Sequence, residues 1–306
     1  MPEEHYPEHY EFFSRDERLS YAEIERVARS FVGLGVTKLR ITGGEPLLRK
    51  DLSALVRLLR VIPGVEDLAL TTNGILLARQ AEALADAGLH RVTVSLDSLD
   101  PQVFAAMSGG RGDPAVVVDG IEAALKNGLT PVKINTVVKR GVNDACVADL
   151  VERFRGTGVI LRFIEFMDVG TRNHWSREQV VPSAELLERI GSRWPLTPME
   201  ESYRGEVATR YRFDDGGGEI GFISSVTDPF CGDCTRARLS ANGELYTCLF
   251  AGKGADLRGM MREGASDGEL EARIEELWGR RSNRYSEQRA GIEHPLRKVE
   301  MYQVGG

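Results

Sequence analysis

Residues 37–73, "TKLRITGGEPLLRKDLSALVRLLRVIPGVEDLALTTN", decide the fold of this chain. The runs at 37–42 and 67–73 are short and apolar, which is typical of buried strands. Between them, residues 51–62 have the apolar spacing of an amphipathic helix, with Asp51 or Ser53 placed to cap it. A strand, a helix and a second strand in this order form the unit from which parallel sheets are built.

The same alternation continues on both sides of this stretch. Further strands are expected at 91–97, 131–138 and 159–167, and further helices at 20–35, 76–88, 114–128 and 144–158. Pro114 is placed to start one helix, and Gly88 and Gly128 to end two others. Strands separated by helices predict a parallel sheet with right-handed crossovers. Part of a barrel fits this pattern better than an open, doubly wound sheet.

The alternation stops after about residue 180, which suggests two regions. Residues 211–225 resemble a hairpin with a glycine-rich turn, and residues 266–286 resemble a helix and its exit. We therefore expect a partial barrel over residues 1–195 and a C-terminal α+β region over residues 196–306.

Composition excludes several classes of protein. The 306 residues carry a net charge of -7, which argues against a general affinity for nucleic acid. No apolar run is long enough to predict a membrane span, and the first residues do not resemble a secretory signal. Four cysteines in such a chain do not suggest a disulfide framework, so we expect a cytoplasmic protein.

Charged and polar residues occur within the expected strands and at their ends. Arg40, Lys133 and Arg162 are cations within otherwise apolar strands, where an unpaired charge is costly. They suggest an anionic ligand. Ion pairs with Glu45, Asp97 and Glu165 are the alternative, with Glu165 placed as a partner of Arg162. The strand ends carry "TGGEP", "TTNG", "SLD" and "EFMDVG", at the edge where parallel sheets bind ligands. By pattern alone, Met167 in the last of these reads as a core residue.

Three of the four cysteines lie in "FCGDCTRARLSANGELYTC", residues 230–248. Cys231 and Cys234 form a C-x-x-C pair, Cys248 follows, and Cys146 reads as a buried thiol elsewhere. A structural zinc site normally has four protein ligands, so three thiols require either a distant fourth ligand or another kind of metal centre.

These segments together resemble the GTP 3′,8-cyclase family of molybdenum-cofactor biosynthesis, whose members are radical S-adenosylmethionine enzymes. The resemblance rests on "RITGGEPLLRKDL", "TTNGILL", "VSLDSLD", "RFIEFMDVG", the cysteine stretch and the terminal "GG". It implies an incomplete (β/α)₆ barrel, here without its first strand, and a C-terminal region with an iron–sulfur site. It also implies that a 5′-deoxyadenosyl radical made from S-adenosylmethionine abstracts hydrogen from GTP C3′.

The resemblance assigns roles residue by residue. It implies that three thiolates hold a 4Fe–4S cluster with one iron open to the base of GTP. The cluster ligands are then Cys231, Cys234 and Cys248, and the S-adenosylmethionine site has Gly44, Ser95 and Met167. The GTP site has Arg40, Thr71, Lys133, Arg236, Ala237 and Arg238. The last two residues, Gly305 and Gly306, correspond to a catalytic tail that reaches into the family's active site.

One departure from the family pattern lies at the start of the chain. The family's radical-generating cluster uses a C-x-x-x-C-x-x-C segment just before a "MPEE"-like stretch, and this sequence begins at that methionine. We expect the chain as written to hold one 4Fe–4S cluster rather than the family's two, and to be unable to split S-adenosylmethionine. Either Met1 is not the true start, or the protein is a non-catalytic, single-cluster GTP-binding relative.

The resemblance also implies partners. The product would pass to a second enzyme, the cyclic pyranopterin monophosphate synthase, and family members tend to be homodimers. A radical enzyme that modifies peptides with an auxiliary cluster is a weaker interpretation, because it does not account for the arginines of "TRAR" or for the terminal "GG".

Overall fold

The main sheet has eight strands in the order β1-β2-β3-β4-β5-β8-β7-β6. The structure is a computed structural model that describes residues 13–289 and 298–301. The strands are β1 Lys38–Ile41, β2 Asp67–Thr72, β3 Arg91–Ser95, β4 Lys133–Val138, β5 Ile160–Glu165, β6 Leu196–Pro198, β7 Thr209–Phe213 and β8 Glu219–Ile223. Strands β1 to β5 pair in parallel, as predicted.

β8 adds a sixth parallel strand beside β5, while β7 and β6 follow in antiparallel pairing. The expected hairpin is therefore confirmed, and its second strand extends the barrel sheet. The predicted domain boundary at residue 195 falls just before β6, so strands on both of its sides belong to one sheet. The division into two regions stays a prediction.

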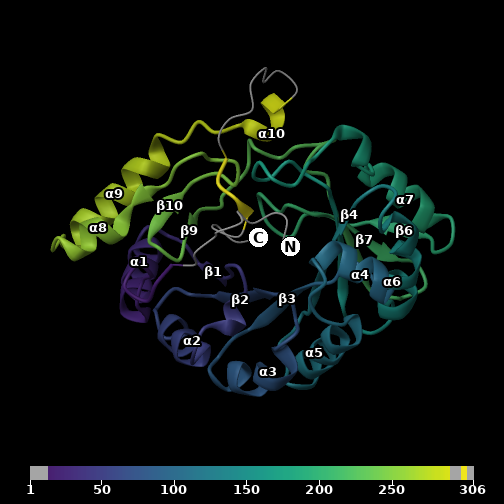
Figure 1. Cartoon of the computed structure of the whole chain (residues 1–306), viewed down its shortest axis with the longest axis horizontal. Helices are drawn as coiled ribbons and strands as arrows, with labels where there is room; N and C mark the ends of the chain where they lie inside the picture. Colours follow the sequence, from purple (N-terminus) through teal and green to yellow (C-terminus); the bar gives the residue numbers. More distant parts are fainter. Residues whose placement is uncertain (1–12, 290–297, 302–306) are drawn as a thin grey trace.

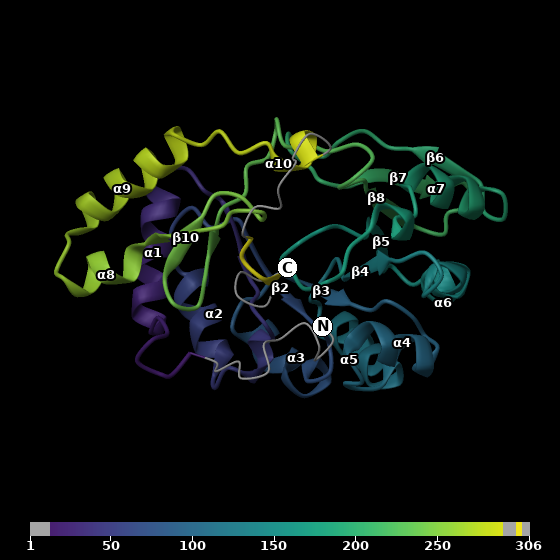
Figure 2. The ribbon, with the colours of Figure 1, turned by 45° about the horizontal axis from the view of Figure 1, so that its top comes forward.

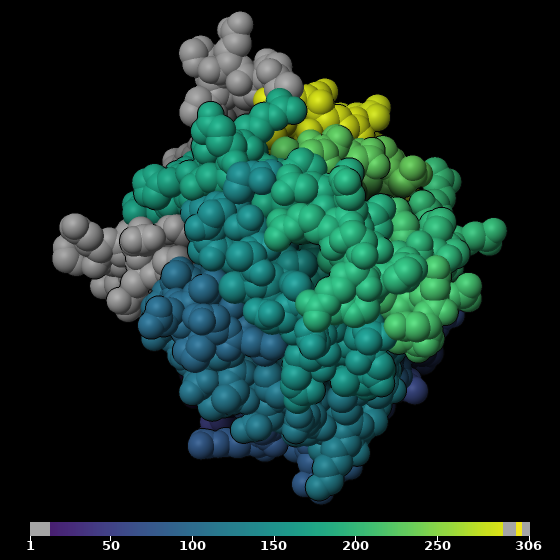
Figure 3. All heavy atoms as spheres, turned by 90° about the vertical axis from the view of Figure 1, so that its right-hand side faces the viewer, coloured from purple at the N-terminus to yellow at the C-terminus, as the bar shows by residue number. Residues whose placement is uncertain are grey.

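Helices cover the outer side of the curved sheet (Figure 1). They are α1 Tyr21–Gly33, α2 Leu52–Arg60, α3 Leu77–Asp86, α4 Pro101–Ser108, α5 Pro114–Lys126, α6 Val147–Phe154 and α7 Ser183–Gly191. Short 3₁₀ turns occupy η2 Pro46–Leu48, η3 Asp144–Cys146 and η4 Arg177–Gln179. Figure 3 views the molecule from the side on which Figure 1 labels α6, α7 and β6.

Local signals explain where these helices begin and end. Asp113 caps α5 and Pro114 is its first residue, as expected. Gly88 and Gly128 follow α3 and α5 with φ of 94° and 74°, a conformation that favours glycine. Asp51 precedes α2, but neither it nor Ser53 caps that helix through its side chain. Helix α4 was not expected from the sequence.

The C-terminal region packs against the start of the chain. It contains a small sheet of β9 Arg238–Leu239, β10 Glu244–Tyr246 and β11 Ala255–Asp256, and the helices α8 Leu257–Arg262, α9 Asp267–Gly279 and α10 Tyr285–Gln288. The helix expected within residues 266–286 is α9, and its exit begins after Gly279. A second apolar core, which includes Val27 of α1 and Ile274 of α9, joins these elements, and Figure 2 shows α8 and α9 beside α1. Within the described residues, no helix is long and apolar enough to cross a membrane.

Candidate active site

The two faces of the main sheet differ in chemistry. On β4, Ile134, Thr136 and Val138 are fully buried against the helices, whereas the alternating Lys133 and Asn135 are partly exposed on the opposite face. Parallel register aligns polar residues across this second face, in the rows Thr71–Thr93–Lys133 and Ser95–Asn135–Arg162. A sheet packed on both sides would be apolar on both faces, so the polar face is the candidate binding surface.

Among the described residues, Lys133 and Arg162 form no ion pair with a carboxylate, whereas Arg91 on the same face pairs with Asp67 at 2.6 Å. Arg162 is 7% exposed, its Nη2 lies 3.4 Å from Thr93 Oγ1, and its Nε has no hydrogen-bond partner. Burial and the repulsion of Arg40 and Arg91 lower the pKa of Arg162. Burial, with Arg162 and Arg91, lowers the pKa of Lys133 to about 8. Positive charge is thus gathered where water is scarce, which favours an anionic ligand.

The three carboxylates expected as alternative partners are engaged elsewhere. Glu45 accepts hydrogen bonds from Thr72 Oγ1 at 2.8 Å and from two backbone amides. Burial raises the pKa of Asp97 to about 6, and Asp97 accepts from the backbone of Val137 at 2.8 Å. Glu165 is buried and accepts from the backbone amides of residues 183, 226 and 227. The expected ion pairs with Arg40, Lys133 and Arg162 are therefore wrong, because these oxygens hold the backbone at the strand ends.

The three expected thiols lie near one another. Burial raises the pKa of the Cys248 thiol, and the charges of Cys231 and Cys234 raise it further. Burial acts the same way on Cys234, but the charge and hydrogen bonds of Arg236 outweigh it and lower the pKa. The Arg236 Nε and Nη2 atoms lie 3.3 Å and 3.1 Å from Cys234 Sγ. Cys146 is half-buried rather than buried, and it is the last residue of η3, directly before α6 and outside this group.

This donor set fits an iron–sulfur cluster. In the described part of the chain, no three His, Cys, Asp or Glu side chains are close enough to share a single metal ion, which a zinc site requires. In a 4Fe–4S cluster each thiolate binds a different iron, so the sulfurs stand farther apart. Soft thiolate ligands match that centre.

The charges beside the thiols and those on the polar face act on one another. Burial and the charge of Arg236 lower the pKa of Arg238 to about 10, and the nearby thiols oppose this shift while Arg40 adds to it. Burial lowers the pKa of Arg40, and the charges of Arg91 and Arg236 lower it further. Arg236, which follows the cysteine pair, therefore lies near β1. Ala237 packs against the second apolar core, and Thr71 Oγ1 is buried on the polar face without a hydrogen-bond partner.

The residues expected at S-adenosylmethionine all follow the carboxyl ends of strands. Gly44 follows β1 after Gly43, whose φ is 151°, Ser95 ends β3 and is exposed, and Met167 follows β5 half-buried. The carboxyl ends of parallel strands lie at one edge of the sheet. Gly305 and Gly306 lie outside the described residues, and their assignment stays a prediction.

Sequence patterns did not reveal a contact between the β6–β7 connection and residues 230–248, which we call the cysteine loop. Tyr203 packs under Lys38, whose Nζ is 3.4 Å from the ring centroid, and Arg204 forms a 3.0 Å ion pair with Asp233. Asp233 lies between the paired cysteines. Such a long-range contact has no local signal, since charged residues in loops are usually solvated.

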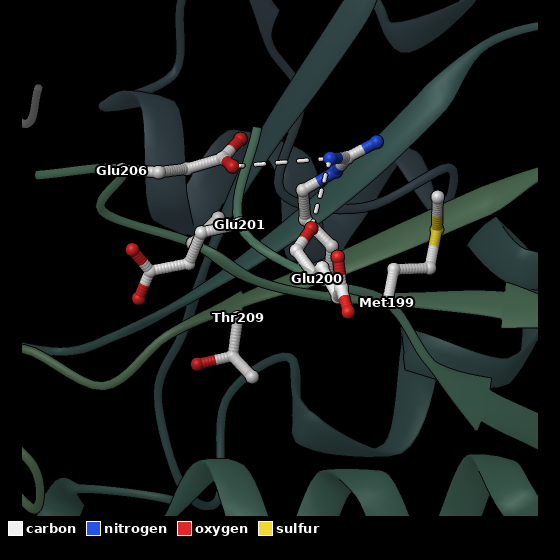
Figure 4. Close-up of a pocket in the computed structure, with 7 residues that line it drawn as sticks. Met199, Glu200, Glu201, Glu206 and Thr209 are labelled. Atoms are coloured by element: carbon white, nitrogen blue, oxygen red, sulfur yellow. Dashed lines mark hydrogen bonds and ion pairs between the residues drawn. The ribbon is translucent and has the colours of Figure 1, made fainter. Parts of the chain in front are cut away.

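The same connection lines a small pocket that differs from the polar face. Figure 4 shows Glu206 directed toward Arg210, with the two side chains 3.8 Å apart, beside Met199, Glu200, Glu201 and Thr209. Arg210 also pairs with Glu219 at 2.5 Å. Its charge is therefore already compensated, unlike the charges of Lys133 and Arg162.

Two segments of the chain match known protein families. Residues 5–154 match the Radical SAM superfamily, and residues 159–287 match the family described as Molybdenum Cofactor Synthesis C. Among solved structures, methylornithine synthase covers 90% of this chain and 77% of its own at 16% identity, with a TM-score of 0.49.

Curated relatives match the whole chain. The GTP 3′,8-cyclase of Xanthomonas campestris pv. campestris is 55% identical over 306 residues, which is 100% of this chain and 89% of that protein. The protein of the same name from Acidothermus cellulolyticus is 51% identical over 95% of this chain and 81% of its own. That of Staphylococcus carnosus is 44% identical over 100% of this chain and 91% of its own. The chain therefore belongs to the GTP 3′,8-cyclase family of radical S-adenosylmethionine enzymes.

Proposed function

We propose that this chain acts in the reaction for which its relatives are named, the 3′,8-cyclisation of GTP in molybdenum-cofactor biosynthesis. One observation carries the proposal. Cations on the polar sheet face lie next to a group of three thiols, and among the described residues no carboxylate forms an ion pair with Arg40, Lys133 or Arg162. The charges of Asp67, Glu206 and Glu219 act on these cations only from farther away. A nucleoside triphosphate with a base that meets the thiol-bound cluster fits both halves of this surface.

The cations would bind the triphosphate. Arg40, Lys133 and Arg162 come from three strands, and Arg236 and Arg238 come from the cysteine loop. Arginine and lysine donate charge-assisted hydrogen bonds to phosphate oxygens, and the burial of Lys133, Arg162 and Arg238 in the free protein strengthens that attraction. Thr71 supplies a further hydroxyl, since its Oγ1 is buried without a partner.

Cys231, Cys234 and Cys248 would hold one 4Fe–4S cluster, and the base would meet the iron that no thiolate occupies. Gly44, Ser95 and Met167 would bind S-adenosylmethionine at the carboxyl edge of the sheet. When bound, this cofactor and its own cluster supply the radical chemistry of the family. The residues of this chain then hold GTP in one orientation and exclude water from the polar face.

The consumption of the product by a cyclic pyranopterin monophosphate synthase, the homodimeric state and a cytoplasmic location stay predictions. A non-catalytic protein that binds GTP at a single cluster is the alternative function. It shares the GTP site and differs only in turnover, so binding and turnover must be measured separately.

The test is anaerobic reconstitution followed by GTP binding. We expect about four iron and four sulfide per chain, from the single group of three thiols. Iron content near twice this value would overturn the ligand assignment. Binding of GTP without cleavage of S-adenosylmethionine would support the non-catalytic alternative, and cyclised product detected by mass spectrometry would support the enzyme.

Arg162→Leu gives this test a distinctive signature. We expect GTP affinity to fall at least tenfold, about 1.4 kcal/mol, because one phosphate contact is lost. Stability should rise or stay equal, since Arg162 is a buried cation without a counter-ion. Arg153→Leu removes an arginine from the outer surface of α6 and should leave GTP affinity unchanged. Equal affinities for the two variants would contradict the proposed site.

A further inference from the structure

Asp168, directly after Met167, collects three cationic or hydroxyl groups from the end of the chain. Its Oδ2 accepts from Tyr285 Oη at 2.6 Å and from Lys298 Nζ at 2.6 Å. Arg289 Nε lies 2.7 Å from Oδ1. The side chains of Asp168, Arg289 and Lys298 are 12%, 10% and 6% exposed, so this is a buried ionic group. We call Asp168, Tyr285, Arg289 and Lys298 the Asp168 cluster.

The Asp168 cluster packs on the residue that supports the third thiol. The Phe250 and Tyr285 rings are stacked, with centroids 4.6 Å apart. Arg289 and Lys298 lie 5.4 Å and 5.7 Å from the Phe250 ring centroid. The backbone N–H of Phe250 points to Cys248 Sγ at 3.4 Å. A shift of Tyr285 would therefore move Phe250, and with it the amide beside the thiol.

The other side of the cluster holds the backbone at the cofactor end of β5. Lys298 Nζ also donates to the backbone carbonyl of Asp168 at 2.7 Å. Asn173 donates to the carbonyl of Met167 at 2.9 Å, and the Trp175 indole donates to the carbonyl of Phe166 at 2.8 Å. The backbone of residues 166–168 is thus fixed by side chains at three successive carbonyls.

The C-terminal segment is tied to the cysteine loop at the same place. Val299 N donates to the carbonyl of Ala251 at 3.0 Å, and Val299 packs with Tyr246 in a small apolar cluster. Lys298 therefore reaches Asp168 from a backbone that already pairs with the segment after Cys248. The cluster closes a ring of contacts between β5, the cysteine loop and residues 298–300.

We propose that Asp168 is a positioning residue that sets the distance between the cofactor end of β5, at Met167, and the third thiol, Cys248. The inference rests on the proposed function, because it concerns the same two ends of that site. A reaction between two bound molecules depends steeply on their separation. A buried carboxylate with two cations is suited to this task, since loss of its charge leaves both cations uncompensated and opens the contact.

The first test uses the apo chain and needs no GTP. Asp168→Asn removes the charge and keeps the side chain's size. We expect the alkylation rate of Cys248, followed by mass spectrometry, to rise about tenfold as local opening increases. Cys146 serves as an internal reference, and its rate should not change. Glu23→Gln is the matched control, because Glu23 pairs with Arg262 across the α1–α8 contact, away from the thiols. An equal Cys248 rate in the two variants would overturn the proposal.

The second test uses the reconstituted chain. We expect Asp168→Asn to keep its iron, because all three thiols remain, and to show a broadened electron paramagnetic resonance signal of the reduced cluster. Lys298→Met should reproduce this change and Lys298→Arg should restore the wild-type signal, which also covers the case that Asp168→Asn fails to fold. A wild-type signal in Lys298→Met would overturn the inference.

GTP separates the inference from the proposed function. If the wild-type chain binds its cluster but not GTP, the proposed function fails, and the alkylation comparison still decides on Asp168. If the wild type binds GTP, we expect about tenfold weaker binding by Asp168→Asn. Unchanged GTP affinity in that variant would contradict a positioning role.

Discussion

Lys133 on β4 lies in a row with Thr93 and near Arg91 and Arg162, and its pKa is about 8 because burial and these charges disfavour the ammonium. The ordinary value is 10.5, so between about pH 8 and pH 10.5 the unfolded chain binds more protons than the folded one. The contribution of Lys133 to stability therefore rises as pH rises through this window. In the free protein the positive charges of Lys133, Arg91 and Arg162 repel one another, and a bound polyphosphate would offset that repulsion.

This arrangement predicts proton uptake on GTP binding. Phosphates raise the pKa of a neighbouring lysine, so binding near pH 8.5 should draw a proton onto Lys133. Calorimetry in two buffers of different ionisation enthalpy measures that proton. Lys133 is about one quarter protonated at pH 8.5 in the free protein, so the expected uptake is about three quarters of a proton. Lys133→Met should abolish the difference between the buffers. Equal heats in both buffers for the wild type would show that Lys133 does not contact the phosphates.

Single residues also show the limit of sequence reasoning. Arg40, Lys133 and Arg162 were recognised because a cation inside an apolar strand is unusual, and their lack of carboxylate partners in the described residues fits an anionic ligand. The alternative pairing with Glu165 failed for a geometric reason. Arg162 and Glu165 are three residues apart on β5, so their side chains point to opposite faces of the strand.

At the scale of elements, the β6–β7 connection presses against the cysteine loop at Gly205. A Cβ atom there would lie 2.5 Å from the carbonyl oxygen of Asp233, and φ at Gly205 is 81°. Gly216, in the β7–β8 turn, has the same kind of backbone with φ of 80°, but its Cβ would meet nothing within 4 Å. The two glycines differ only in what stands beside them.

We therefore predict different results for alanine at these two positions. Gly216→Ala should cost about 1 kcal/mol of unfolding free energy, from the left-handed backbone alone. Gly205→Ala should cost more and should also displace the loop between Cys231 and Cys234, so that less iron is retained after reconstitution. Denaturant unfolding and iron analysis measure both effects. Equal iron content in the two variants would show that the contact does not hold the thiols.

The elements themselves were largely predictable. Strands β1 to β5 and most helices follow the apolar periodicity, because their sequence patterns are long and bounded by proline, aspartate or glycine. Helix α4 was missed because it is short and directly follows a strand end. The role of β8 as the sixth parallel strand was also missed, since hairpin signals specify the partner within the hairpin and not the strand beside it.

At the scale of the whole molecule, two apolar cores hold the site together. The larger core lies between the main sheet and its helices. The smaller core joins α1 to α9 and to the small sheet of β9, β10 and β11. Ile190 of α7 belongs to the first core and Ile274 of α9 to the second, and both are 2% exposed. The same substitution at the two positions separates the roles of the cores.

We predict that Ile190→Ala and Ile274→Ala each cost about 2–5 kcal/mol, as expected for a buried isoleucine. Only Ile274→Ala should speed the loss of iron to a chelator under conditions where both variants remain folded, because only the second core anchors the region that carries the thiols. Absorbance of the cluster follows this loss. Equal rates would indicate that the second core does not anchor the cysteine loop.

The sequence by itself determined the strand–helix alternation, the cations within strands, the group of three cysteines and the resemblance to the family. Each strand, helix and cysteine spacing is a local feature, read over about 20 residues or fewer, and the alternation and the resemblance are sums of such local features along the chain. Only the tertiary structure decided that Glu45, Asp97 and Glu165 hold backbone amides rather than the cations, and that Asp168 joins the end of β5 to the cysteine loop. Contacts between residues more than 100 positions apart depend on how the elements pack, and no local pattern encodes that packing.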